Sequence, residues 1–288
     1  MKEHVSPKQL ARALHVSESS VKRWCDQGKI TAVRTAGGHR RIQMTEVVDF
    51  LRIGRHELVR PEVLGLPPAS GRAQRSFEQA QQQLRESLLA GDEEQCRRIV
   101  FDLHLEDRPL VRILDEVIAK SLQGIGHAWE IGEAEVYQER RSCEICLRIV
   151  HELRGLTAAP QPTTSLLAMG SAAESDPYSL PTAMIELVLK SIGWRAVSLG
   201  ANLPFATLRA AVREHQPQLF WLSVSYMENE EAFIAGYRQL AEEAPRGTAI
   251  AVGGRALNED LRKRMVYTTY CDNLQQLEHF AKVLLGAR

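Results

Sequence analysis

The stretch "SAAESDPYSLPTAMIELVLKSIGW", residues 171–194, decides the fold of the C-terminal part of the chain. The apolar run "TSLLAMG", residues 164–170, precedes it and predicts a strand, and the periodic apolar residues after the second proline predict a helix. The loop between them lies where an open α/β sheet usually binds a ligand. That loop contains two prolines and a tyrosine but neither a glycine nor a histidine, which raises the question of what it binds.

The segment from about 163 to 288 alternates between strand-like and helical patterns. Strands are expected in "SLLAMG", "RAVSLGA", "LFWLSVSY", "TAIAVGG" and "VYTTYC", and helices over 181–192, 205–214, 229–243, 258–265 and 274–285. These units predict a doubly wound, five-stranded parallel sheet of the Rossmann or flavodoxin type. Its ligand site should lie at the carboxyl ends of the strands, in the loop of Asp176 and in "GANLP", "SVSYMEN" and "GGRALN".

Residues 76–156 are helical throughout in their apolar spacing, and four such stretches with short connections predict a four-helix bundle. Residues 56–75 contain three prolines and little periodicity, which predicts a linker. In residues 1–55, Ser6 and Pro7 open one short helix and Ser17 caps a second, basic one, which is typical of a helix-turn-helix. The following "KITAVRTAGGHRRI" predicts a β-hairpin wing, and "MTEVVDFLR" predicts a closing helix.

The composition is that of an ordinary globular chain, with 36 basic against 36 acidic residues among 288. The balance hides a basic N-terminal segment, which indicates that this end contacts a polyanion. Five cysteines without a disulfide framework fit a reducing compartment. No apolar run is long enough for a membrane span and the first residues lack a signal-peptide pattern, so we expect a cytoplasmic protein without a membrane partner.

Basic residues cluster around the Gly37-Gly38 turn and in the second helix, a density that suits a phosphate backbone better than a merely solvated basic face. The run "SPKQLARALHVSESSVKRWCDQGKI" with "TAGGHRRI" resembles the MerR family of winged helix-turn-helix regulators over about 50 residues. The resemblance implies a dimer on a palindromic operator. It also implies DNA contacts from Ser20, Lys22, Arg23, Arg34, His39, Arg40 and Arg41.

In the bundle, Trp129 ends one predicted helix and Glu139 lies in the next, within "WEIGEAEVYQER". On a helical wheel, Glu139 shares a stripe with Val136, Cys143, Cys146, Val150 and Leu153. A carboxylate on such a stripe needs a partner, so Glu139 either forms a buried ion pair or contacts a ligand. Cys143 and Cys146 lack the second pair of ligands that a zinc site requires, so we interpret them as bundle core and expect no metal site.

The order of a MerR-like head, a helical bundle and a five-stranded α/β domain resembles the CarH/LitR-type regulators, which use adenosylcobalamin to sense light. That group carries W-x9-E-H in the bundle, over the upper face of the corrin. This chain has Trp129 and Glu139 at the matching spacing, but Arg140 stands in place of the histidine. The resemblance therefore implies a cobalamin site in which Trp129, Glu139 and Arg140 lie on the upper side.

The cobalamin-binding fold also carries D-x-H-x-x-G in its first strand-to-helix loop, where the histidine binds cobalt and the nucleotide tail enters a pocket beside the sheet. Here Asp176 is kept, Tyr178 replaces the histidine and Pro181 replaces the glycine. A phenol with a reference pKa of about 10 is a poor cobalt ligand near neutral pH. We therefore expect that ordinary histidine-ligated cobalamin is lost.

The signature of the tail pocket is mixed. At the family's S-x-L this chain has Ser223, Val224 and Ser225, so the first serine is kept, and the family's glycine pair is present as Gly253 and Gly254. Two interpretations stay open at this stage. Either the tail groove survives without the cobalt ligand, or these glycines serve only the packing of the sheet edge.

No P-loop, nucleophile elbow or pair of catalytic carboxylates is present, so we expect no enzyme. We predict a DNA-binding transcriptional repressor whose cobalamin-binding-like module controls oligomerisation, and hence the valency of the DNA-binding heads, with light sensing lost. Its partners are operator DNA and further copies of the chain, as a dimer or tetramer.

Four alternatives stay open. The first is cobalamin in another ligation state, a functional light sensor included. The second is another flat chromophore or metabolite that contacts Tyr178 or Arg140. The third is a ligand-free assembly module. The fourth is a corrinoid carrier for methyl transfer, a protein that requires the histidine and has no use for a DNA-binding head.

Overall fold

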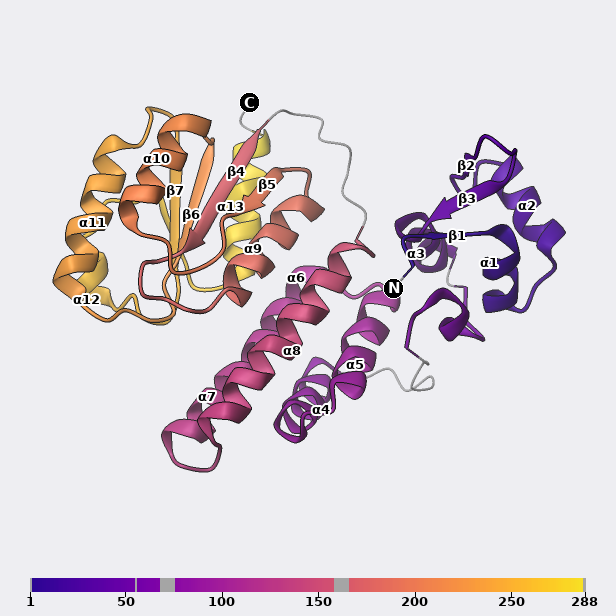
Figure 1. Cartoon of the computed structure of the whole chain (residues 1–288), viewed down its shortest axis with the longest axis horizontal. Coiled ribbons are helices and arrows are strands. Elements are labelled where there is room, and N and C mark those ends of the chain that lie inside the picture. The colour runs from indigo at the N-terminus through magenta and orange to yellow at the C-terminus, as the bar shows by residue number, and fades with distance from the viewer. Residues whose placement is uncertain (1, 55, 68–75, 158–165, 287–288) are drawn as a thin grey trace. The chain divides into compact units, whose positions relative to one another are not determined.

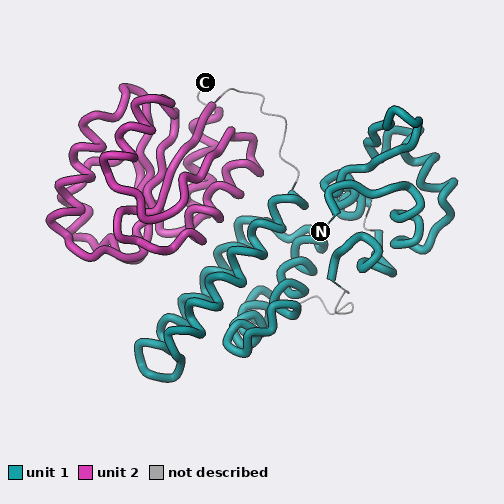
Figure 2. Tube along the Cα trace, in the orientation of Figure 1, with its two compact units in different colours: residues 1–158 teal, residues 159–288 magenta. Residues whose placement is uncertain are grey.

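The computed structural model describes residues 2–54, 56–67, 76–157 and 166–286 (Figure 1). The chain divides into two compact units, residues 1–158 and residues 159–288 (Figure 2). Unit 1 holds the N-terminal segment and the long helices, and unit 2 holds the sheet.

The N-terminal segment is a winged helix-turn-helix. Helix α1 (Pro7–Leu14) begins with a capping box between Ser6 and Gln9, and α2 (Glu18–Asp26) begins at Ser17, whose hydroxyl accepts a hydrogen bond from the Ser20 amide. His15, in the left-handed conformation at φ 56°, makes the turn between the two helices. Hydrogen bonding of side chains to the free amides therefore fixes both helix starts.

The wing is an antiparallel sheet of β1 (His4–Val5), β2 (Val33–Arg34) and β3 (Arg40–Gln43) in the order β1-β3-β2, and α3 (Met44–Gly54) follows it directly. Alternation puts Ile42 inside while its neighbours on β3 lie further out, so the strand covers the core with one face. The fold predicted for this segment is confirmed.

The first part of the predicted linker is ordered structure. Residues Pro61–Leu64 form a short 3-10 helix, η1, and Leu64 and Leu66 are buried. The amide of Val59 donates to the Ala13 carbonyl over 2.9 Å, so this segment packs against α1. Residues 68–75 of the predicted linker lie outside the described residues.

The helical segment contains the four predicted helical stretches. They are α4 (Phe77–Ala90), α5 (Glu93–Leu105), a continuous helical run over 110–130, and α8 (Val136–Arg154). The run over 110–130 consists of α6 (Leu110–Arg112), η2 (Ile113–Ala119) and α7 (Lys120–Glu130), and η2 has π-helical hydrogen bonding. Apolar periodicity predicts the helix, but it does not predict the wider π-helical turn.

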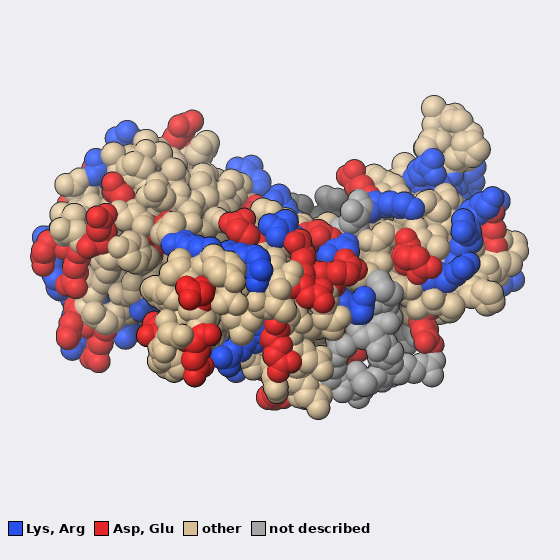
Figure 3. All heavy atoms as spheres, turned by 60° about the horizontal axis from the view of Figure 1, so that its bottom comes forward, with Lys and Arg blue, Asp and Glu red and all other residues tan. Residues whose placement is uncertain are grey.

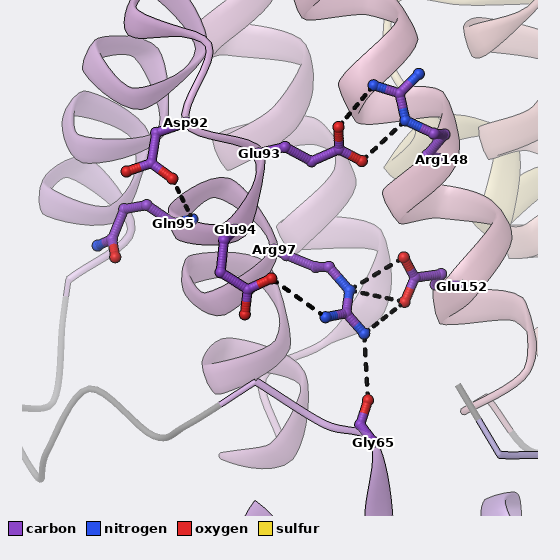
Figure 4. A network of polar contacts seen from close by, with 8 residues as sticks. All are labelled: Gly65, Asp92, Glu93, Glu94, Gln95, Arg97, Arg148 and Glu152. Atoms are coloured by element: carbon purple, nitrogen blue, oxygen red, sulfur yellow. Dashed lines mark hydrogen bonds and ion pairs between the residues drawn. The ribbon is translucent and has the colours of Figure 1, made fainter. Parts of the chain in front are cut away.

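A network of charged groups joins the helices α5 and α8 to the segment before them (Figure 4). The guanidinium of Arg97 donates to Glu152 over 2.8 Å and to the Gly65 carbonyl over 3.3 Å. Arg148 forms a bidentate pair with Glu93, with two N–O distances of 2.8 Å. Paired donors and acceptors of this kind fix the relative register of the two helices.

Unit 2 is a parallel sheet in the order β5-β4-β6-β7-β8. The strands are β4 (Leu167–Ala172), β5 (Arg195–Ser198), β6 (Leu219–Ser223), β7 (Ala249–Gly253) and β8 (Thr269–Cys271). The helices are α9 (Leu180–Ser191), α10 (Phe205–His215), α11 (Glu230–Glu243), α12 (Glu259–Arg262) and α13 (Leu274–Gly286). This is the doubly wound flavodoxin-like order, and it confirms the predicted fold class.

Candidate functional site

The exposed side of the helix-turn-helix is basic. On α2, Lys22 and Arg23 are exposed, and Lys22 is held 2.8 Å from Glu18 one turn earlier. Ser20 is half-buried, and its hydroxyl lies 2.8 Å from that of Ser17. Figure 3 shows Lys and Arg side chains gathered over this part of the molecule, at the right of the view. The helix thus presents cations where a recognition helix meets DNA.

The wing residues divide into two groups. Arg34, His39 and Arg41 are exposed around the turn between β2 and β3. Arg40 is different, because only 18% of its side chain is exposed and its guanidinium lies 2.5 Å from the Asp26 carboxylate. It also donates to the Lys22 carbonyl over 3.4 Å. Arg40 therefore ties the wing to the end of α2, a role that the sequence pattern did not distinguish from phosphate binding.

A second contact joins the DNA-binding segment to the helices. The Arg52 guanidinium on α3 donates to the Asp107 carboxylate from Nε over 2.8 Å. Beside it, the imidazole of His104 on α5 is fully buried, and neither ring nitrogen has a hydrogen-bond partner among the described residues. Burial lowers the pKa of His104 to about 4, so this imidazole is neutral at physiological pH.

At the turn between α7 and α8, the expected ligand-facing residues are partly exposed. Trp129 is 44% exposed, whereas the Glu139 side chain is 14% exposed and lies 3.6 Å from the guanidinium of its neighbour Arg140. The thiol of Cys143 also donates to Glu139 over 3.5 Å. The observed Glu139–Arg140 pair fits the ion-pair interpretation, and it leaves the outer side of Trp129 uncovered within unit 1.

The predicted apolar stripe on α8 holds only in part. Cys146, Val150 and Leu153 are buried, but Val136 is 51% exposed. Exposed Ile131 and Tyr137 lie near it in the chain, and the helical wheel did not single them out. The reason is that Val136 is the first residue of α8, where the helix has not yet reached the core of the bundle.

The loop between β4 and α9 is held together by Asp176. Its carboxylate is fully buried and accepts hydrogen bonds from the amides of Tyr178 at 3.0 Å, Ser225 at 2.5 Å and Tyr226 at 3.3 Å. Burial raises the pKa of Asp176, and the three amide donors oppose that rise. Asp176 therefore joins the loop after β4 to the loop after β6.

Tyr178 occupies the place of the expected metal ligand. Its side chain is half-buried, and the guanidinium carbon of Arg255 lies 6.0 Å from its ring centroid. Arg255 also donates to the Ser225 carbonyl over 3.1 Å, so it bridges the loop that Asp176 holds. An exposed arginine near a phenol suits the edge of an anionic or aromatic group rather than a metal ion.

Ser223 and the two glycines lie where β6 and β7 end. Ser223 is buried and pairs in register with Gly253. A Cβ atom on Gly253 would lie 2.6 Å from the Cys271 carbonyl, and one on Gly254, at φ 120°, would lie 2.3 Å from the Val224 carbonyl. Close approach of neighbouring backbone thus explains both glycines without a ligand.

A histidine-ligated cobalamin with its tail beside the sheet does not fit these residues. None of the loops at the carboxyl ends of β4 to β7 contains a histidine, and Tyr178 stands where the resemblance to the cobalamin-binding fold leads us to expect the ligand. The indole of Trp221 lies beside the sheet, where a Cβ on Gly170 would be only 2.2 Å from it. Among the described residues, no group of three or more His, Cys, Asp or Glu side chains is placed to hold a metal ion.

Two known protein families match separate parts of the chain. Residues 5–53 match the Helix-turn-helix domain family, and residues 80–154, in the helical segment, match the B12 binding domain family. The chain is thus a multidomain protein that joins a segment similar to helix-turn-helix domains to a segment similar to B12 binding domains. No helix within the described ranges combines the length and apolarity that crossing a membrane demands.

The chain is also similar to individual proteins over much of its length. The chain is 32% identical over 177 residues to the HTH-type transcriptional repressor CarH of Myxococcus xanthus, a match that covers 60% of this chain. The chain spans 58% of the length of that relative. The monomethylamine corrinoid protein of Methanosarcina barkeri has a similar fold, with a TM-score of 0.61 at 15% identity, over 74% of this chain and 100% of that one. The resemblance to CarH-type regulators drawn from the sequence is confirmed.

Proposed function

We propose that this protein is a DNA-binding transcriptional regulator that acts as a repressor. The observation that carries the proposal is the exposed basic surface of the winged helix-turn-helix, formed by Lys22, Arg23, Arg34, His39 and Arg41. The α2 helix enters the major groove, where Ser20 and its neighbours reach base edges. The wing lies along the backbone and neutralises phosphates. Such a protein has no reaction to catalyse, which places it outside the enzymes.

The helical segment and unit 2 set the number of DNA-binding heads in one assembly. Linking heads raises their effective concentration at neighbouring half-sites, so a dimer or tetramer binds repeated or palindromic sites far better than one copy does. The exposed apolar side chains of Trp129, Ile131, Val136 and Tyr137 support this proposal. Surfaces of this kind usually mark contact with a ligand or another chain.

The module no longer senses light through a histidine-bound cobalamin. The phenol of Tyr178 supports this part of the proposal, because it would have to lose its proton to bind cobalt. A corrinoid carrier is less favoured, since it needs the imidazole that the loop lacks. Cobalamin bound without a protein imidazole, or a different flat chromophore near Tyr178 and Arg255, is compatible with the half-buried ring and the adjacent guanidinium.

The proposed function is tested by DNA binding. Genomic fragments selected on the full-length protein supply an operator, and fluorescence anisotropy measures its affinity against random DNA at several salt concentrations. The variant Arg34→Ala should bind both DNAs more weakly. Arg213→Ala, which removes an exposed arginine of α10 in unit 2, is the matched control. Equal affinity of wild type and Arg34→Ala at every salt concentration would contradict the proposal.

A further inference from the structure

The two faces of the sheet in unit 2 differ in the size of their side chains. Side chains alternate along each strand, and residues paired in register point to the same face. On one face, Phe220, Leu222, Ile250 and Val252 form a core with α10 and α11. On the other, which also carries Leu219, the neighbours of Trp221 in the register are mostly small residues: Ala168, Gly170, Ala172, Ser198, Ser223 and Ala251.

Trp221 fills the space that these small residues leave. It is the largest of the fully buried side chains, with 1% exposure. Its register partner on β4 is Gly170, and a Cβ atom there would lie 2.2 Å from the indole. That Cβ atom would also lie 2.3 Å from the backbone carbonyl oxygen of residue 221, so the close approach of the indole and of the neighbouring strand together require glycine at position 170.

The indole is held by hydrogen bonds as well as by packing. Its N–H donates to the Thr182 hydroxyl on α9 over 2.8 Å, and that hydroxyl lies 3.1 Å from the Ser198 hydroxyl on β5. Ser198 in turn accepts a hydrogen bond from the Gly200 amide over 3.2 Å. A bicyclic aromatic ring with one polar edge is therefore fixed between the sheet and α9 by matching hydroxyl groups.

We propose that the indole of Trp221 occupies the place of a bicyclic heteroaromatic ligand, so that the protein cannot take the nucleotide tail of a cobalamin beside its sheet. This inference rests on the proposed function in one respect, which is that the excluded ligand is a cobalamin. Indole and benzimidazole share the same fused-ring frame, and a close-packed interior holds one such ring in this space, not two. The indole of Trp221 thus fills the space that the benzimidazole of the tail would need.

The test removes the indole and asks whether a free ring replaces it. In the full-length protein, Trp221→Gly should open a hollow that binds benzimidazole, seen as a rise in Tm and as saturable heat in calorimetry. Wild type should show neither. The matched control is Trp194→Gly, since Trp194 is the other buried tryptophan of unit 2 and donates to the Ala281 carbonyl over 3.3 Å. It should not bind benzimidazole.

Each outcome decides the proposal. Benzimidazole binding by Trp221→Gly alone supports it, whereas binding by both glycine variants, or by neither, overturns it. If Trp221→Gly does not fold alone, refolding with benzimidazole should restore a cooperative transition, and a failure to do so counts against the proposal. Trp221→Val, which suits a strand, then supplies a folded variant with a smaller hollow, and its benzimidazole affinity should lie above that of wild type.

A spectrum of the wild-type protein gives an independent check. Added hydroxocobalamin should keep its own base bound to cobalt, and a stoichiometric base-off spectrum on wild type would overturn the proposal. Operator binding by the same variants is measured in parallel. Because those titrations report on unit 1, failure of the proposed function and failure of this inference give different results.

Discussion

Arg40 and Arg41 are adjacent and equally charged, yet their surroundings in the structure differ, and we expect them to affect DNA binding differently. The Arg40 guanidinium lies 2.5 Å from Asp26, whose side chain is 60% exposed, while Arg41 is exposed. A pair with one partly exposed member contributes about 0.5–1 kcal/mol to the stability of the wing. We therefore expect Arg40→Ala to loosen the wing and Arg41→Ala to remove a phosphate contact.

The dependence of binding on salt separates these two effects. Each phosphate contact contributes about 0.9 to the slope of log affinity against log salt concentration. Between 50 and 200 mM salt, one contact therefore changes the affinity about 3.5-fold. Arg41→Ala should lower the slope by about 0.9, whereas Arg40→Ala should weaken binding by a similar factor at every salt concentration.

Fluorescence anisotropy with the selected operator and with random DNA measures both slopes. Asp26→Asn is the complementary variant, because it releases Arg40 and should raise the slope. If Arg40→Ala lowers the slope as much as Arg41→Ala does, and Asp26→Asn changes nothing, then the ion pair opens on DNA. In that case the assignment of Arg40 to the wing–helix contact is wrong.

Further predictions concern the buried groups. The imidazole of His104 takes up a proton below about pH 6.5 in the unfolded chain but only below about pH 4 in the folded protein, because burial lowers its pKa. The free energy of unfolding should therefore decrease by about 3 kcal/mol as the pH is lowered from 6.5 to 4. His104→Leu should remove most of that decrease, measured by urea unfolding at several pH values. Asp176→Ala leaves buried amides without acceptors and should lower the unfolding free energy by about 2–4 kcal/mol, whereas Asp176→Asn should cost less. Gly170→Ala should destabilise the protein by at least about 1–3 kcal/mol in calorimetric scans, because the added Cβ atom meets both the indole and the backbone carbonyl oxygen of Trp221. Protein purified with adenosylcobalamin in the dark should emerge nearly colourless, and a bound spectrum that bleaches in light would contradict the loss of light sensing.

Local signals in the sequence predicted most of the fold. The cap at Ser17, the apolar spacing of the long helices and the short apolar runs of unit 2 each depend on neighbours within a few residues. The strand order was not predicted, because both the Rossmann and the flavodoxin orders fit five parallel units, and only the strand pairing in the structure distinguishes them. The packing of residues 56–67 against α1 was not predicted. A proline-containing stretch without apolar periodicity does not indicate which distant residues it contacts.

The candidate site was harder to predict, because its residues act through long-range contacts. Asp26 was not singled out, and only the fold brings it to Arg40. Trp221 was read simply as part of an apolar strand, since periodicity alone does not tell which face of a sheet a residue occupies. Arg255, like Asp26, became a candidate only when the structure placed it beside Tyr178.

The pairing of Trp221 with Gly170 has a consequence at the level of the gene. Tryptophan has the single codon TGG, and one base change turns it into GGG, a glycine codon. Since the surrounding residues are already small, a single point mutation separates a filled interior from an open one. One base change is therefore enough to remove the indole from this interior.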